Sequence, residues 1–242
     1  MHFVYSVKMM QSLLSNLDAV RQRIAKATRD CGRPADTVCL LAVSKKFPAQ
    51  DVQAMAQGGQ IDFGENYIQE GVEKIISLKP TNPLLVWHCI GPIQSNKTKW
   101  VAENFDWVHS IDRLKIAQRL SEQRPLGLKP LQVCLQVNVD GGASKSGIAP
   151  DEVLALAQAV MQLPQLQLRG LMTIPEPADT YELQLHVHQQ TKKLFDELKS
   201  PLSLQKFDTL SMGMTTDLEA AIHAGATMVR VGTALFGRRD VA

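Results

Sequence analysis

The sequence predicts an α/β fold, a single (β/α)₈ TIM barrel with one extra helix before the first strand. Its 242 residues are about the size of one such barrel. Short apolar runs alternate eight times with longer helical stretches, which is typical of βαβ units in a parallel sheet. The first apolar run ends in SKKFP and lacks the G-x-G-x-x-G turn of a dinucleotide-binding sheet. This disfavours the alternative, an open doubly wound sheet.

The extra helix is expected from Met10 to Arg29, where Leu13, Leu17 and Ile24 recur at helical spacing. Residues 1–9 are expected to form an N-terminal tail, and residues 10–242 a single barrel domain. No linker or low-complexity segment divides the chain. The strands are expected at residues 38–45, 61–66, 84–91, 107–111, 131–139, 166–174, 207–213 and 227–232.

Helices are expected between these strands. Thr216 and Glu219 fit a capping box at the start of the last one, and Gly225 fits the position just after its end. The helical stretches cover residues 51–59, 67–78, 96–105, 112–123, 151–163, 181–199 and 215–225.

The composition excludes several classes of partner. A formal net charge of +2 is too small to predict nucleic acid or an anionic membrane as the main partner. No apolar run is long enough to span a bilayer, and the N-terminus is a poor signal peptide. The four cysteines form no C-x-x-C pair, so we expect reduced thiols in a cytoplasmic protein. No metal site is expected, because His186 and His188 are two residues apart and face different sides of a helix.

Lys45 is the first candidate for chemistry, because barrel enzymes carry their active sites at the C-terminal ends of the strands. Leu41, Val43 and Lys45 alternate along the first strand, so Lys45 should face the barrel interior and Lys46 should face outward. A desolvated lysine has a lowered pKa and can attack a carbonyl to form a Schiff base. The alternative is a surface lysine at the start of a loop.

The loops after the seventh and eighth strands are the second candidate site. Such loops form the usual phosphate site of these barrels, together with the N-terminus of a short helix. Ser211 and Thr233 offer hydroxyl groups, and Gly232 allows backbone N–H groups to approach an anion. The alternative is that these are turn and cap residues. The eighth strand closes onto the first, so a phosphate here would lie near Lys45.

These residues lie in stretches that resemble the pyridoxal phosphate homeostasis protein family, whose barrel is similar to the N-terminal domain of alanine racemases. The resemblance runs in order from about residue 10 to the C-terminus. The stretches that carry it are LLAVSKKFP, FGENYIQEGVEKI, WHCIGPIQSNK, SKSGI, GLMTI and LSMGMTTDLEAAIHAGATMVRVGTALFG. One departure is Lys46-Phe47, where many relatives carry a small polar residue followed by a basic one.

The resemblance implies that pyridoxal 5′-phosphate is the cofactor and that Lys45 holds it as a Schiff base. It implies that Ser211, Gly232 and Thr233 hold the phosphate, with Gly213 in the same motif, and that Arg230 lies against the pyridine nitrogen. The remaining residues that it places in the cofactor pocket are Asn66, His88 and Met172.

Arg230 also has a physical meaning of its own. A guanidinium group cannot accept a proton, so it keeps the pyridine nitrogen unprotonated and makes the ring a poorer electron sink. The alternative is a structural arginine. Alanine racemases take a second acid/base residue, a tyrosine, from a second domain across a dimer. This sequence ends just past the eighth strand, so we expect no such domain, no efficient racemisation and a monomer.

Several other residues keep two interpretations. Glu65 is either a carboxylate in the site or a helix-capping acid. His109 is either a core histidine with a backbone partner or a side chain in the barrel mouth. Lys46 and Lys145 are candidate amines for a second cofactor site, and a solvated Lys145 is the alternative.

Three functions remain. The first is a non-catalytic pyridoxal phosphate-binding protein of vitamin B6 and amino-acid homeostasis, which hands the cofactor to apo-enzymes that depend on it. The second is a pyridoxal phosphate-dependent amino-acid racemase. The third is a Schiff-base aldolase with a phosphorylated substrate, which is disfavoured because its usual lysine lies on a later strand.

Overall fold

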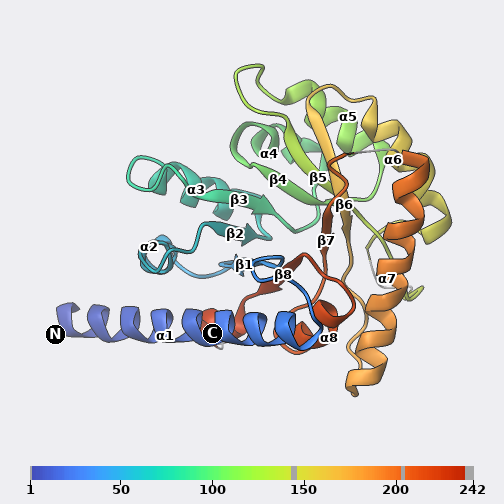
Figure 1. The fold of residues 1–242 in the computed structure, drawn as a ribbon. Helices are drawn as coiled ribbons and strands as arrows, with labels where there is room; N and C mark the ends of the chain where they lie inside the picture. The colour runs from blue at the N-terminus through green and yellow to red at the C-terminus, as the bar shows by residue number, and fades with distance from the viewer. Residues whose placement is uncertain (1, 143–145, 203–204, 238–242) are drawn as a thin grey trace.

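A computed structural model describes residues 2–142, 146–202 and 205–237. Eight parallel strands form a closed barrel in the order β1 to β8, which confirms the predicted (β/α)₈ fold (Figure 1). Each strand pairs with its sequence neighbours, and β8 closes onto β1 with Leu41 opposite Arg230. The strands are β1 Cys39–Val43, β2 Asp62–Glu65, β3 Val86–Cys89, β4 Trp107–Ile111, β5 Leu131–Gln136, β6 Leu166–Met172, β7 Thr209–Ser211 and β8 Met228–Val231.

Helices follow the strands and cover the outside of the barrel. Two short 3₁₀ helices, Ser95–Lys97 and Pro150–Glu152, lead into α4 and α6. The α-helices are α1 His2–Asp30, α2 Ala49–Gln57, α3 Ile68–Leu78, α4 Thr98–Asn104, α5 Leu114–Gln123, α6 Val153–Met161, α7 Tyr181–Leu202, α8 Leu218–His223 and α9 Thr233–Phe236.

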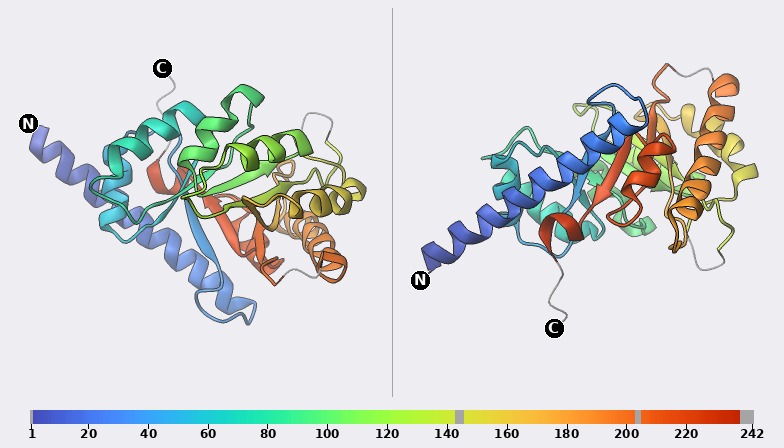
Figure 2. Two further views of the ribbon diagram at one scale, coloured as in Figure 1. Left: turned by 90° about the horizontal axis from the view of Figure 1, so that it is seen from above. Right: turned by 60° about the horizontal axis from the view of Figure 1, so that its bottom comes forward.

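The extra helix α1 is longer than the sequence pattern indicates. It begins at His2 rather than Met10, so residues 2–9 continue the helix instead of forming a tail. Its apolar face packs against α2, α8 and α9 (Figure 2). Leu13, Leu17 and Ile24 are buried in this contact, as their helical spacing predicts.

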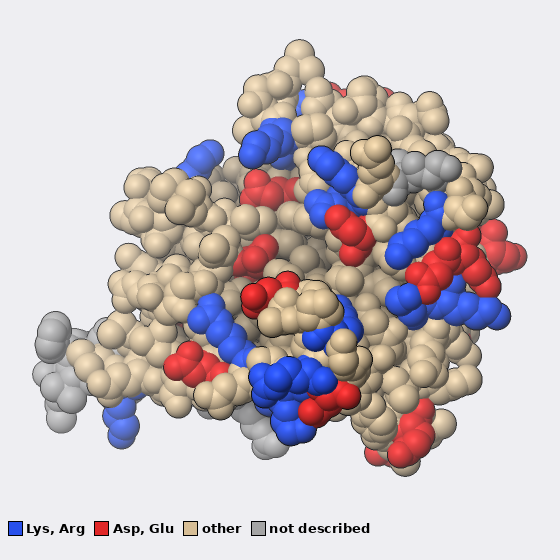
Figure 3. All heavy atoms as spheres, viewed as in Figure 1, with Lys and Arg blue, Asp and Glu red and all other residues tan. Residues whose placement is uncertain are grey.

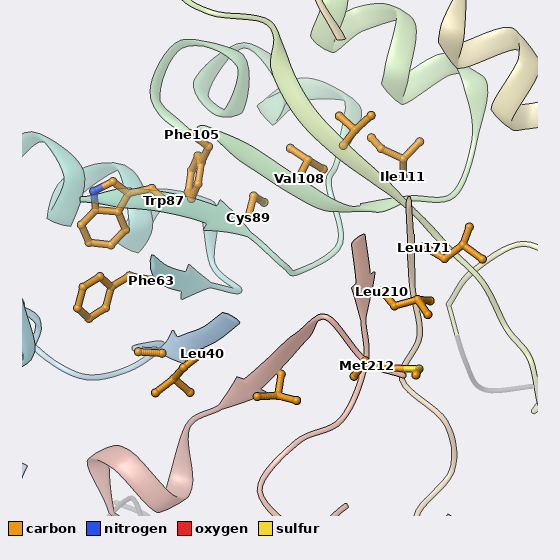
Figure 4. Packing of buried hydrophobic residues seen from close by; sticks show 14 of the residues in the cluster. Leu40, Phe63, Trp87, Cys89, Phe105, Val108, Ile111, Leu171, Leu210 and Met212 are labelled. Atoms are coloured by element: carbon orange, nitrogen blue, oxygen red, sulfur yellow. The ribbon is translucent and has the colours of Figure 1, made fainter. Parts of the chain in front are cut away.

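Two apolar layers result from the alternation along each strand. Leu40 and Ala42 belong to the large core between the strands and the helices. Leu41 and Val43 point the other way, into a smaller cluster inside the barrel with Ile90 and Met228. Figure 4 shows part of the large core, where the rings of Phe63 and Trp87 lie 5.8 Å apart. This alternation is the one that predicts an inward Lys45.

The start of α8 differs from the prediction. Asp217, rather than Thr216, is the N-cap residue, and its carboxylate accepts a 2.7 Å hydrogen bond from the Met214 N–H. Glu219 pairs with Arg23 of α1 at 2.9 Å, so the expected capping box does not form. The end of the helix agrees with the prediction, because Gly225 follows it with a φ of +107°.

Candidate functional site

A cavity of about 290 Å³ opens at the C-terminal end of the barrel. This is the end at which barrel proteins carry their sites, and the volume is near the lower limit for small-molecule pockets. Residues from six strand ends and their loops meet there. The lining residues are Val43, Lys45, Asn66, Ile90, Ile174, Met214, Thr215, Thr216, Arg230, Gly232 and Thr233.

Lys45 lies in the turn just after β1, and its partly buried side chain lines the cavity. The turn is closed by a 3.1 Å hydrogen bond from the Phe47 N–H to the Ser44 carbonyl. Lys46 adopts a φ of +65° and is exposed, with its ammonium group 5.8 Å from the Tyr67 ring centroid. The left-handed backbone at Lys46 therefore turns the two neighbouring lysines to different sides.

A buried ion pair holds both neighbours of Lys45 in place. The Lys74 ammonium group donates to Glu65 at 2.7 Å and to the Ser44 carbonyl at 2.8 Å. The Ser44 hydroxyl donates to the same Glu65 oxygen at 2.6 Å, and the Lys46 N–H donates to Glu70 at 2.6 Å. Glu65 is thus neither a cavity residue nor a helix cap. Burial raises the pKa of its carboxyl group, and the neighbouring Lys74 opposes that rise.

Arg230 reaches the cavity from β8, although it is 4% exposed. One guanidinium nitrogen donates to the Ser211 carbonyl at 2.6 Å and to the Ser211 hydroxyl at 2.9 Å. The other donates to the Thr173 carbonyl at 2.8 Å. Burial lowers the Arg230 pKa to about 10, so the group is still a cation at neutral pH. Its partners fix the plane of the guanidinium group at one end of the cavity.

Four of the expected site residues are not in the cavity lining, namely Ser211, His88, Met172 and Gly213. Ser211, His88 and Met172 are fully buried in or beside the barrel interior. The Ser211 hydroxyl is engaged by Arg230 and by His109, each at 2.9 Å. His109 is therefore a core histidine, as one interpretation held, but its partners are side chains instead of the backbone. The assignment of Ser211 to a phosphate stays a prediction.

The glycines of the last two loops allow close packing around the cavity. Gly213 has a φ of +89°, and a Cβ atom there would lie 2.4 Å from the Ala221 side chain. Gly232 precedes α9, and a Cβ atom there would lie 3.3 Å from the Val43 carbonyl. Thr233 begins α9 and lines the cavity. The β8 loop therefore lies directly against the end of β1, next to Lys45.

Asn66, which lines the cavity, carries an unsatisfied polar atom. Its Oδ1 atom is buried without a hydrogen-bond partner in the described part of the chain. The position is enforced by packing, because a Cβ atom at Gly91 would lie 2.2 Å from the Asn66 carbonyl. A buried acceptor without a partner costs free energy, so this site is suited to a polar ligand.

Comparisons with known proteins show the family of this chain. A family model described as the alanine racemase N-terminal domain matches residues 15–240. A protein of Pseudomonas aeruginosa named pyridoxal phosphate homeostasis protein is 56% identical over 233 residues, covering 96% of this chain and 97% of that one. A Pasteurella multocida protein of the same name is 53% identical, covering 93% and 97%. This chain belongs to the pyridoxal phosphate homeostasis protein family.

Two solved structures are similar to this barrel. PipY of Synechococcus elongatus, solved with pyridoxal phosphate bound, is 35% identical and superposes with a TM-score of 0.81, covering 93% of this chain and all of that one. An alanine racemase of Corynebacterium glutamicum has a TM-score of 0.64 at 17% identity and covers 92% of this chain and 61% of that one. The racemase likeness shows a shared fold alone.

Six residues that line the cavity were not among the predicted site residues, namely Val43, Ile90, Ile174, Met214, Thr215 and Thr216. The signal was present in the run GMTT, which places two hydroxyl groups just after β7. Thr215 and Thr216, rather than Ser211, line the cavity from the β7 loop.

Other expectations concern the rest of the chain. Lys145 lies outside the described residues. Within the described ranges, no cluster of three or more His, Cys, Asp or Glu residues could hold a metal ion. None of the described helices is long and apolar enough to cross a bilayer. Basic and acidic side chains lie interspersed on the face seen in Figure 3.

Proposed function

We propose that this chain binds pyridoxal 5′-phosphate at the mouth of its barrel, with Lys45 as the Schiff-base lysine. The observation that carries the proposal is one cavity lined by Lys45 and Arg230, with threonine- and glycine-bearing loops beside them. This donor set fits an aldehyde, a pyridine ring and a phosphate. The family name of the relatives and the cofactor in PipY support it.

Bound pyridoxal phosphate would supply an electrophilic aldehyde carbon and an electron-withdrawing ring. Lys45 would provide the amine that holds this carbon. Thr233 and Gly232 would hold the phosphate, because the first backbone N–H groups of a helix lack partners within it. Thr215 and Thr216, which also line the cavity, add two further hydroxyl groups.

Arg230 would face the pyridine nitrogen. Its guanidinium group can donate a hydrogen bond but cannot accept a proton, so the ring would stay unprotonated. Such a ring withdraws electrons weakly, which restrains carbanion chemistry. We therefore propose a homeostatic role in vitamin B6 and amino-acid metabolism without efficient catalysis, in which the cofactor is handed to apo-enzymes. Four free thiols in the described chain support a reducing, cytoplasmic location, and we propose that the protein acts there as a monomer.

The test is the absorption spectrum of the purified protein with added cofactor, followed by borohydride reduction and peptide mapping. Reduction should fix the cofactor on Lys45. Lys45→Ala should abolish this adduct, whereas Lys46→Ala, the matched control, should keep it. A cofactor that maps to another lysine in the wild-type protein would show that the assignment of Lys45 is wrong.

Catalysis is tested separately. Incubation with single L-amino acids in deuterated water should give no α-proton exchange above that of free pyridoxal phosphate. Exchange with accumulation of the D-isomer would instead show a racemase.

A further inference from the structure

A row of polar side chains crosses the interior of the barrel. It starts at Arg230 and Ser211 near the cavity and ends at Asp62. Asp62 is the first residue of β2 and so lies at the N-terminal end of the barrel, opposite the cavity. The Ser211 hydroxyl lies 2.9 Å from His109 Nδ1, and His109 Nε2 lies 2.9 Å from His88 Nδ1. His88 Nε2 then lies 3.1 Å from the Asp62 carboxylate.

This row is unusual for a barrel interior, which is normally filled by branched aliphatic side chains. Both histidines and Ser211 are fully buried, and the His88 ring stacks on Trp107 with centroids 5.4 Å apart. Buried polar groups destabilise a fold unless every member is hydrogen-bonded. Each of these side chains is hydrogen-bonded to the next one in the row, so that requirement is met. The residues come from different strands, so they meet only when the barrel closes.

The hydrogen bonds have one consistent direction. Arg230 can only donate, so the Ser211 oxygen accepts from it, and the Ser211 hydroxyl proton goes to His109 Nδ1. His109 then carries its proton on Nε2 and donates it to His88 Nδ1. Burial, with His88 and Arg230 nearby, holds the pKa of His109 well below its ordinary value, which agrees with a neutral ring.

His88 consequently carries its proton on Nε2 and donates it to the Asp62 carboxylate. The opposite direction would give Ser211 two donors, Arg230 and His109. Its own proton would then need another acceptor, and within the described part of the chain the Ser211 hydroxyl makes no hydrogen bond to any group besides His109 and Arg230. The row therefore runs from a buried cation to a carboxylate with each donor facing an acceptor.

We infer that His109, His88 and Asp62 are positioning residues that set the donor geometry of Arg230 from the far end of the barrel. The inference rests on the proposed function, since Arg230 is the group that would face the cofactor ring. Asp62 is 29% exposed and lines a second cavity, of about 450 Å³, beside α1. A change at that cavity would therefore reach the cofactor site through four hydrogen bonds.

The first test needs no cofactor. Ring ¹⁵N NMR of the cofactor-free protein should show both His88 and His109 as neutral rings protonated at Nε2. A His109 ring protonated at Nδ1, or on both nitrogens, would overturn the assigned direction. Since this measurement does not involve pyridoxal phosphate, it decides the inference even if the proposed function fails.

The second test measures coupling to the site. His109→Leu should weaken pyridoxal phosphate binding about tenfold and shift the visible absorption band. The Ser211 hydroxyl loses its acceptor and can turn its proton toward Arg230, which then keeps only the Ser211 and Thr173 carbonyls as fixed partners. His109→Gln should restore part of the affinity and of the band position, since an amide can accept and donate. The control is Thr98→Val, which removes a 3.0 Å hydrogen bond from a buried hydroxyl to the Ser95 carbonyl at the start of α4 and should change neither.

Asp62 provides a milder probe if His109→Leu does not fold. Asp62→Leu should weaken binding about threefold and Asp62→Asn less, because only the amide keeps an acceptor for His88. Unchanged affinity and spectrum in both Asp62→Leu and a folded His109→Leu would overturn the inference. If the wild-type protein does not bind pyridoxal phosphate either, the proposed function is refuted instead.

Discussion

Removing the buried ammonium group of Lys74 should destabilise the protein and disturb Lys45. We consider Lys74→Met, which keeps most of the side-chain volume and removes the charge. Lys74 is almost fully buried and donates three hydrogen bonds, to Ser44, Glu65 and Glu70, at 2.6–2.8 Å. Two of these partners fix the backbone on either side of Lys45.

The size of the effect follows from what is left behind. Glu65 is 0% exposed, and without Lys74 its carboxylate would be a buried charge with the Ser44 hydroxyl as its remaining donor. Breaking a buried pair by removing one partner costs about 3–5 kcal/mol. Small domains are stable by roughly 5–15 kcal/mol, so the variant should still fold.

The loss of stability should depend on pH. Burial raises the pKa of Glu65, and removing the opposing effect of Lys74 should raise it further. A carboxyl group whose pKa is higher in the folded state binds its proton more tightly there, so the free energy of unfolding falls as the pH rises from the unfolded pKa to the folded one. Lys74→Met should therefore be more destabilised at pH 8 than at pH 5.

Urea unfolding of both proteins at these two pH values measures the effect. Adding Glu65→Gln to Lys74→Met should recover part of the loss, because the buried charge is gone. The matched control is Lys99→Met, which breaks the exposed pair with Glu103 at 3.7 Å and should cost about 0.5 kcal/mol or less. A Lys74→Met loss as small as that of the control, without pH dependence, would refute the reasoning.

Two further perturbations test the site from its edges. Gly91→Ala should destabilise the protein by about 3 kcal/mol or more and weaken cofactor binding, because the new Cβ atom would lie 2.2 Å from the Asn66 carbonyl. Thermal unfolding and a cofactor titration measure the two effects. An unchanged melting temperature would contradict the prediction. Burial alone would raise the pKa of Asp217, but hydrogen bonds from His188 and the Met214 N–H hold it below its ordinary value. Its stabilisation is therefore present above the unfolded pKa and lost as the pH falls through the folded pKa. Urea unfolding should show wild type and Asp217→Asn converging in acid, and a constant difference would count against this assignment.

The sequence pattern was sufficient to predict the fold and the position of Lys45 at the mouth of the barrel. Eight apolar runs alternating with helical stretches are a local pattern, and their number and order were sufficient to predict the closed barrel. The alternation along β1 correctly placed Leu41 and Val43 inside the barrel and Lys45 at the cavity, since side chains in a strand alternate by geometry alone. The strand ends were less accurate, because pairing stops where the barrel opens into polar loops. β1, for example, ends at Val43 rather than Lys45.

The partners of the buried polar residues depend on tertiary packing and could not be predicted from local sequence patterns. Glu65 could not be assigned from the sequence, because its partner Lys74 lies on the following helix and the distance between them depends on how that helix packs. Ser211 and His109 are 102 positions apart and meet only when β4 and β7 face each other across the barrel. A hydrogen bond needs its two atoms within about 3 Å of each other. Local patterns fix which face a residue occupies, and closure of the barrel fixes what it meets there.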